Sequence, residues 1–190
     1  MRSLSKTCFV ALFLSLATVA ATAQQRVHAA SGVVTAIYPK IQMIELNMDD
    51  GTSGHFKWLR KSDPPIEFDK SVSTDTVTAD QFATLKAHVI LYYVGDGDVR
   101  TAVAVRPLGD APLNTANGTV VKLNRHDRQL TIKTSAGTEE SFHLDPKTVG
   151  DTENGVAQGF KFDFNKGNAV RVTFTASDGG ETALLIAPVL

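Results

Sequence analysis

The sequence predicts an all-β protein that consists of two tandem five-stranded barrels. Three observations predict this fold class. Apolar residues alternate with polar residues, clusters of turn-forming residues separate the alternating segments, and the whole pattern occurs twice along the chain. Because successive side chains of a strand point to opposite faces, this alternation gives each strand one apolar and one wet face.

The alternation is clearest in the second half of the chain. In three segments there, apolar residues occupy every second position: Leu130 and Ile132; Phe142 and Leu144; and Val170, Val172 and Phe174. Gly and Asp gather between the expected strands, in the segments 49–51, 95–98, 135–137 and 178–180. These residues favour the tight turns of β-hairpins. We therefore expect five strands in each half, with a longer connection between the third and the fourth.

An internal repeat sets the domain organisation. Three landmarks recur 86 residues later, where Gly32, Gly51 and Phe56 match Gly118, Gly137 and Phe142. Farther along, Val89, Thr101-Ala102 and Pro107 match Val170, Thr182-Ala183 and Pro188 at a spacing of 81 residues. The first copy is therefore five residues longer. We expect a first module over residues 31–108, a linker over residues 109–116 and a second module over residues 117–190.

The longer connection of the first module predicts a short helix. Thr78 and Gln81 have the spacing of a capping box, and Phe82 and Leu85 would give the helix an apolar face. Three strands, a helix and two strands is the order of a partly open OB-like barrel whose helix plugs one end. The equivalent residues 149–166 are rich in Gly and Asn, so the helix is expected at least in the first module.

The repeated landmarks resemble a known group of domains. A Gly-x-Val start, a Gly-Thr turn, an aromatic third strand and a closing Thr-Ala before an apolar strand are similar to exported bacterial OB-like barrel domains of unknown function. The resemblance covers both modules, although Lys86-Ala87-His88 departs from the Gly-Asp type of turn typical of it. The resemblance implies the fold and a location in the cell envelope, and it implies no catalytic residue.

The N-terminus has the pattern of a secretory signal peptide. Arg2 and Lys6 precede an apolar stretch, and Ala21-Thr22-Ala23 ends it with small residues at the positions that a signal peptidase reads. The alternative is a membrane anchor, but the stretch is shorter than the roughly 20 apolar residues of a spanning helix. We expect cleavage after Ala23, which makes residues 1–23 the signal peptide, and a periplasmic or secreted protein without a membrane span in its mature chain.

Composition excludes several functional classes. The chain has 19 Lys and Arg against 20 Asp and Glu, and loss of the signal peptide removes two of the basic residues. A nucleic-acid partner is not expected, because such proteins need a basic field. The single Cys also lies in the signal peptide, so the mature chain has neither a disulfide nor a thiolate nucleophile.

No motif predicts a catalytic residue, a cofactor site or a metal site. The five His residues, at positions 28, 55, 88, 126 and 143, lack the short helical spacing of a zinc site. His143 and Asp145 would share one face of a strand, and His126 could add a third ligand. There is no Gly-x-Ser-x-Gly elbow and no Gly-rich phosphate loop before a helix. The sequence therefore predicts no enzyme, no cofactor and no metal.

Two functional hypotheses follow. The leading one is a non-enzymatic binding or scaffolding protein of the cell envelope or extracellular space, with a protein or small-molecule ligand of unknown identity. The alternative is a small metal-handling protein or hydrolase that uses His55, His126 or His143.

One strand of the first module predicts an interface. The second copy has Arg171, Thr173 and Thr175 on the outward face of its fourth strand, but the first copy has Ile90, Tyr92 and Val94 there. A strand that is apolar on both faces is usually covered on both. The final strand is also apolar without alternation, so the candidate interface residues are Ile90, Tyr92, Val94 and Leu185. We expect the two modules to pack on each other through them; a ligand patch, a partner surface or a homodimer contact is the alternative.

Overall fold

The computed structural model describes residues 26–59, 75–76, 87–97, 100–109 and 113–189. The strands of the first module are β1 (His28–Tyr38), β2 (Met43–Met48), β3 (Ser53–Trp58), β4 (Asp75–Thr76), β5 (His88–Val94) and β6 (Arg100–Gly109). Those of the second are β7 (Asn114–Asn124), β8 (Gln129–Thr134), β9 (Glu139–Thr152), β10 (Gly155–Gln158), β11 (Ala169–Ser177) and β12 (Gly180–Pro188). No helix occurs in these ranges.

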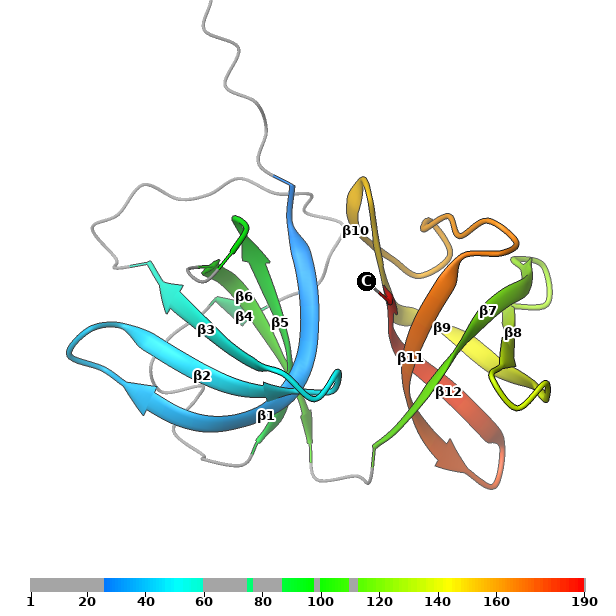
Figure 1. The fold of residues 1–190 in the computed structure, drawn as a ribbon, viewed down its shortest axis with the longest axis horizontal. Coiled ribbons are helices and arrows are strands. Elements are labelled where there is room, and N and C mark those ends of the chain that lie inside the picture. The colour runs from blue at the N-terminus through cyan, green and yellow to red at the C-terminus, as the bar shows by residue number, and fades with distance from the viewer. Residues whose placement is uncertain (1–25, 60–74, 77–86, 98–99, 110–112, 190) are drawn as a thin grey trace, which may run out of the picture.

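Each module is a closed five-stranded barrel (Figure 1). In the first, the order β3-β2-β1-β5-β6 closes through a parallel pairing of β3 with β6. In the second, β9, β12, β11, β7 and β8 follow one another and β8 pairs with β9 to close the ring. The pairing of β9 with β12 is again parallel. The two modules are therefore small OB-like barrels with one topology, and β4 and β10 are additions outside the ring.

The predicted fold class was wrong in two respects. The barrels are closed rather than partly open, because the third strand of each module reaches the fifth. No helix stands between the third and fourth strands in the described residues; in the second module β9 instead turns back into β10. Gly155 takes a φ of 96° at this turn, and the Thr152 hydroxyl donates to the Gly155 carbonyl oxygen at 2.9 Å. The predicted helix of the first module, from Thr78 to Leu85, lies outside the described residues, as does the predicted signal peptide.

The internal repeat is confirmed in the backbone. A Cβ atom on Gly32 would lie 2.5 Å from the carbonyl oxygen of Asn47, and one on Gly118 would lie 2.7 Å from that of Lys133. Gly is required at both positions because the first strand of each barrel crosses closely over the second. The β-bulges recur as well, after Val34 in β1 and after Val120 in β7.

Each barrel has its own apolar core. The first contains Phe56, Leu91 and Val105, among others, and the second contains Phe142, Val172 and Ile186. An aromatic pair recurs too: the ring centroids of Phe56 and Tyr93 lie 5.3 Å apart, and those of Phe142 and Phe174 lie 4.9 Å apart. The two cores explain how each module can hold its shape.

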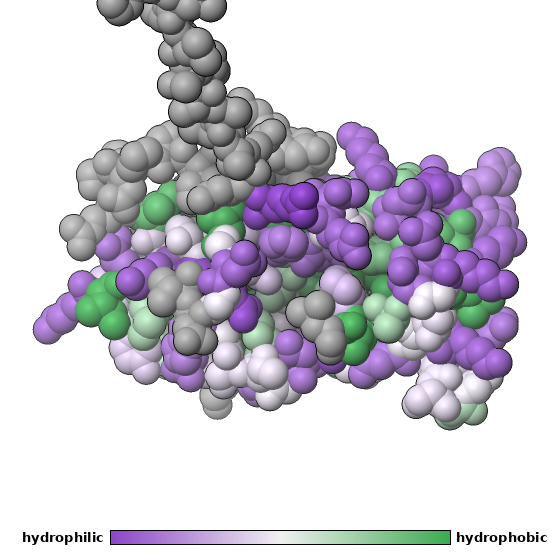
Figure 2. All heavy atoms as spheres, turned by 45° about the horizontal axis from the view of Figure 1, so that its top comes forward, coloured by the Kyte–Doolittle hydropathy of each residue, from purple (hydrophilic) through white to green (hydrophobic). Residues whose placement is uncertain are grey.

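Hydrophilic side chains dominate the face drawn in Figure 2, and apolar residues appear there only as separate patches. Three large apolar side chains are exposed in the described part of the chain: Tyr38, Ile41 and Val189. No helix within the described ranges has the length and hydropathy needed to cross a bilayer.

Candidate ligand-binding cleft between the modules

A third apolar cluster contains residues from both modules. The four predicted interface residues, Ile90, Tyr92, Val94 and Leu185, are all buried in it. Strand β5 thus has two apolar faces: Val89 and Leu91 belong to the core of the first barrel, whereas the residues between them belong to this cluster. That the two modules pack on each other through this surface, rather than using it to bind a partner, stays a prediction.

Tyr92 brings a polar atom into this apolar cluster. Its hydroxyl is buried and has no hydrogen-bond partner in the part of the chain described. Burial raises the pKa of the Tyr92 hydroxyl above its usual value. The group therefore stays neutral, and its missing hydrogen bond is a cost to the folded state.

Beside the cluster, a His–Asp pair joins the two modules. His28 Nδ1 on β1 lies 3.0 Å from Asp151 Oδ1 on β9, and the backbone N–H of Ala29 donates to Asp151 Oδ2 at 3.3 Å. The hydrogen bond with Asp151 raises the pKa of His28, against a smaller lowering by burial. Protonated His28 is thus held by a carboxylate of the other module.

A second carboxylate, Asp49, stands at the turn between β2 and β3. Its side-chain oxygens lie 3.0 and 3.1 Å from His88 Nε2, and Thr173 Oγ1 of β11 donates to Oδ2 at 3.1 Å. Thr173 Oγ1 also lies 2.9 Å from the hydroxyl oxygen of Ser31. Burial alone would raise the pKa of Asp49, but hydrogen bonds from His88, Ser31 and Thr173 outweigh it and hold that pKa below its usual value. Asp49 therefore remains a carboxylate and ties three strands together.

Hydrogen bonds to backbone carbonyl oxygens extend this set of interactions. The N–H of Val156 in β10 donates to the carbonyl oxygen of Val27 at 2.9 Å, so the residues before β1 lie alongside β10. The Arg106 guanidinium donates to the carbonyl oxygens of Lys147 and Leu184. Val27 belongs to the apolar cluster, and Val156 and Leu184 pack against it.

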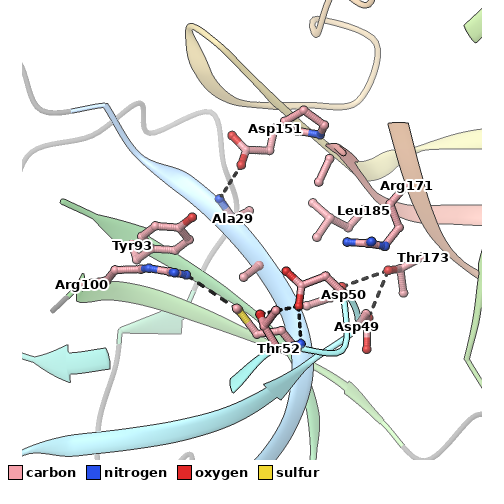
Figure 3. A pocket seen from close by; sticks show the side chains of 15 residues that line it. Ala29, Asp49, Asp50, Thr52, Tyr93, Arg100, Asp151, Arg171, Thr173 and Leu185 are labelled. Atoms are coloured by element: carbon pink, nitrogen blue, oxygen red, sulfur yellow. Dashed lines mark hydrogen bonds between the residues drawn. The ribbon is translucent and has the colours of Figure 1, made fainter. Parts of the chain in front are cut away.

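A cleft of ≈ 200 Å³ opens among these polar contacts. Its walls come from β1, β5, β6 and the β2–β3 turn on one side, and from β9, β11 and β12 on the other. Figure 3 shows Tyr93 and Arg100 on one side, Arg171 and Leu185 on the opposite side, and Asp151 and Asp50 between them. Acidic, basic and apolar groups therefore converge on one small volume.

The two guanidinium groups of the cleft differ in their surroundings. Arg100 lies over the rings of Tyr93 and Phe56, 5.2 and 5.4 Å from their centroids, and its Nε donates to the Gly97 carbonyl oxygen at 3.3 Å. Arg171 is half-buried, and its guanidinium has neither a hydrogen bond nor an ion pair with the residues described. Protein contacts therefore hold the guanidinium of Arg100, whereas the N–H donors of the Arg171 guanidinium are unused by the residues described.

The His residues of the metal hypothesis lie apart from the cleft lining. His55 and His143 are exposed on β3 and β9, and His126 is exposed in the turn after β7. The proposed companion ligand, Asp145, already accepts from the backbone N–H of Lys147 at 2.6 Å. Among the described residues, no three His, Cys, Asp or Glu side chains gather as a metal site would require.

Sequence reasoning missed the polar residues of the cleft. Arg171 and Thr173 were expected on a wet face, but Thr173 is only 1% exposed. The segment 49–51 was expected only as a hairpin tip, which it is, with Gly51 at a φ of 85°. No signal within either repeat could show that Asp49 faces Thr173, because the two residues are 124 positions apart in the sequence and lie in different modules.

Comparison with known proteins gives two similar solved structures, both of CusF. The crystal structure of Ag(I)CusF is 15% identical and covers 41% of this chain and 99% of its own, with a TM-score of 0.33. The structure of apo-CusF residues 6–88 from Escherichia coli is 14% identical and covers 44% of this chain and 94% of its own, with a TM-score of 0.34. No protein-family model and no curated protein matches the chain.

Proposed function

We propose that this is a non-enzymatic binding protein of the cell envelope or extracellular space that takes a small ligand in the cleft between its modules. The observation that carries the proposal is the convergence of charged and apolar side chains from both modules on one volume of ≈ 200 Å³. Sites for drug-sized ligands span about 300–1,000 Å³, so the ligand is smaller than those.

The order of the polar contacts supports binding rather than catalysis. In a hydrolytic triad a His lies between the carboxylate and the nucleophilic hydroxyl, so that it can take the proton. Around Asp49 the carboxylate is in the middle instead, with His88 on one side and Thr173 on the other. The nearby hydroxyl of Ser31 contacts Thr173, which is not a base. This arrangement fixes positions and activates no nucleophile.

The proposal requires the two modules to act as one unit. Its support is the buried cluster around Tyr92 and the polar contacts of Asp49 and Asp151. A buried Lys without a partner is costly, so Tyr92→Lys should separate the modules and leave both barrel cores intact. We expect small-angle scattering to show a longer particle for the variant, with both modules still folded. A variant as compact as the parent that loses a protein partner or a dimer would assign this surface to binding between chains.

The envelope address rests on the N-terminal pattern, which predicts a secreted form that begins at Gln24. Intact-mass measurement of protein recovered from the periplasm or medium tests it. The mass of the uncleaved chain would remove the basis for this address.

The cleft itself can be tested by filling it. Ala187 and Thr52 both line the cleft, the first half-buried on β12 and the second exposed after β2. Ala187→Phe and Thr52→Phe each place a ring at the cleft. In a thermal-shift screen against small anionic, neutral and cationic compounds, we expect at least one compound to stabilise the parent and to fail with one of these variants. A ligand in this cleft would be contradicted if both folded variants were stabilised as much as the parent. It would also be contradicted if no compound stabilised the parent.

Metal handling by surface His residues is the second candidate. On this chain the observation in its favour is a pair formed by exposed His55 and half-buried Glu45, because His55 Nε2 lies 4.0 Å from Glu45 Oε2 on the neighbouring strand. Of the two similar solved structures, one holds Ag(I), which accords with this candidate rather than with a scaffold. Calorimetric titration with Ag⁺, Cu²⁺ and Zn²⁺ decides between the two. Binding in the cleft predicts no tight one-to-one metal site, whereas such a site abolished by His55→Ala or His143→Ala would establish metal handling.

A further inference from the structure

We infer that the cleft between the modules selects a small organic anion, whose carboxylate or similar group is bound by the guanidinium of Arg171. This inference rests on the proposed function and adds the chemical class of the ligand. It follows from which donors and acceptors of the cleft are already used by the protein.

Two of the three carboxylates of the cleft are engaged at both oxygens, and the third is engaged at one. Asp151 accepts from His28 and from the backbone N–H of Ala29. Asp49 accepts from His88 and Thr173. Asp50 Oδ1 accepts from both the backbone N–H and the hydroxyl of Thr52, at 2.8 and 2.6 Å. A cationic ligand would have to compete with these contacts at Asp49 and Asp151, and among the described residues it would find only the exposed Oδ2 of Asp50 without a contact.

The larger free capacity of the cleft is that of a donor. A guanidinium carries five N–H donors in a planar fork that suits a carboxylate. Arg100 uses part of its fork on Gly97 and stacks on two aromatic rings. Arg171, on the opposite side in Figure 3, has no such contact with the residues described and lines the cleft from β11. Its backbone position is fixed, because β11 is paired on both sides, with Ala187 of β12 and Asn117 of β7 facing Arg171.

The remaining walls favour an apolar body on the anion. Tyr93, Leu185, Ala187 and Pro188 also line the cleft. Apolar groups removed from water there would add affinity to the charged contact. With a volume of ≈ 200 Å³, the cleft suits one ring or short chain that bears one anionic group.

Three probes of one shape test the inference: benzoate, benzyl alcohol and benzylammonium, titrated calorimetrically into the full mature protein at matched ionic strength. We expect benzoate alone to bind. A charge-assisted hydrogen bond contributes about 1.5–3 kcal/mol, so Arg171→Gln should weaken benzoate binding by about 10- to 100-fold. Lys133→Gln is the matched control, because it removes the same charge from an exposed position on β8 outside the cleft lining, and it should leave the affinity unchanged.

Each other outcome overturns the inference. If benzoate binds the Arg171→Gln variant as tightly as it binds the parent protein, its binding does not depend on this guanidinium. Binding of benzyl alcohol or benzylammonium in preference to benzoate, with loss in Ala187→Phe, would contradict an anion but leave the cleft as a ligand site. If none of the probes binds the parent, the anion site is wrong, and the wider screen against the cleft-filling variants then judges the proposed function separately.

Discussion

At the scale of single residues, two carboxylates connect the modules in different electrostatic ways. Asp151 meets an imidazole whose pKa it raises, whereas Asp49 has its own pKa lowered by the donors around it. The two groups respond to pH in opposite directions. The contact of His28 is strongest when the imidazole is protonated, and that of Asp49 is lost only in acid, as the carboxylate takes up a proton.

His28 gives a pH prediction whose sign is fixed. Because its pKa in the folded protein lies above the 6.5 of the unfolded chain, its contribution is complete below that value and declines as pH rises through the folded pKa. The hydrogen bond with Asp151 is the main cause, with Asp96 adding to it and Arg26 opposing it. We expect the loss of stability caused by His28→Gln to be larger at about pH 5.5 than at about pH 8.5. Chemical denaturation of parent and variant at both values measures it, and a loss independent of pH would contradict a charged contact.

Tyr92 gives a second prediction at this scale. Its buried hydroxyl has no partner in the described residues, so Tyr92→Phe removes a desolvated group at little cost in packing. We expect the free energy of unfolding to rise by about 1 kcal/mol. Tyr93→Phe is the matched control, because the Tyr93 hydroxyl is not a buried group without a partner and its removal should not stabilise the protein. Destabilisation by Tyr92→Phe would mean that a bound water or another group satisfies this hydroxyl.

At the scale of the elements, the strands could be predicted because each carries its own period. The alternation at Leu130 and Ile132, or at Val170 and Val172, is local and appears in β8 and β11. The connection between the third and fourth strands of the second module, by contrast, could not be predicted as a strand. A hairpin from β9 to β10 satisfies that connection through Thr152 and Gly155, and neither residue marks a strand by periodicity.

The first strand passes close to the second in both barrels, and this close approach gives a prediction for β7. Gly118→Ala would bring a Cβ to 2.7 Å from the Lys133 carbonyl oxygen, and backbone cannot yield cheaply there. We expect a loss of about 1–3 kcal/mol, the usual range for an overpacked site. Gly179→Ala, in the turn before β12, is the control, since its Cβ would meet nothing closer than 3.8 Å. Equal stability of the two variants, measured by denaturant unfolding, would contradict the close crossing.

At the scale of the whole molecule, the cleft could be predicted only in part. The sequence indicated the outward apolar face of β5, because Ile90, Tyr92 and Val94 stand where the second copy is polar. It could not indicate the polar residues beside that face. In the sequence, Arg171 has the pattern of an ordinary solvent-exposed position on a strand. Its place in the cleft depends on the residues of the first module that line the opposite wall, such as Tyr93 and Arg100. Repeats reveal what two modules share, whereas a site between them depends on how they differ.

The central claim is that residues of both modules together form one ligand site. The most direct measurement is a titration of ¹⁵N-labelled mature protein with benzoate, followed by backbone amide shifts. We predict concerted, saturable shifts at Ser31, Thr52 and Arg100 of the first module and at Arg171 and Ala187 of the second, with a single affinity. Saturable shifts confined to one module, or centred away from these residues, would contradict it.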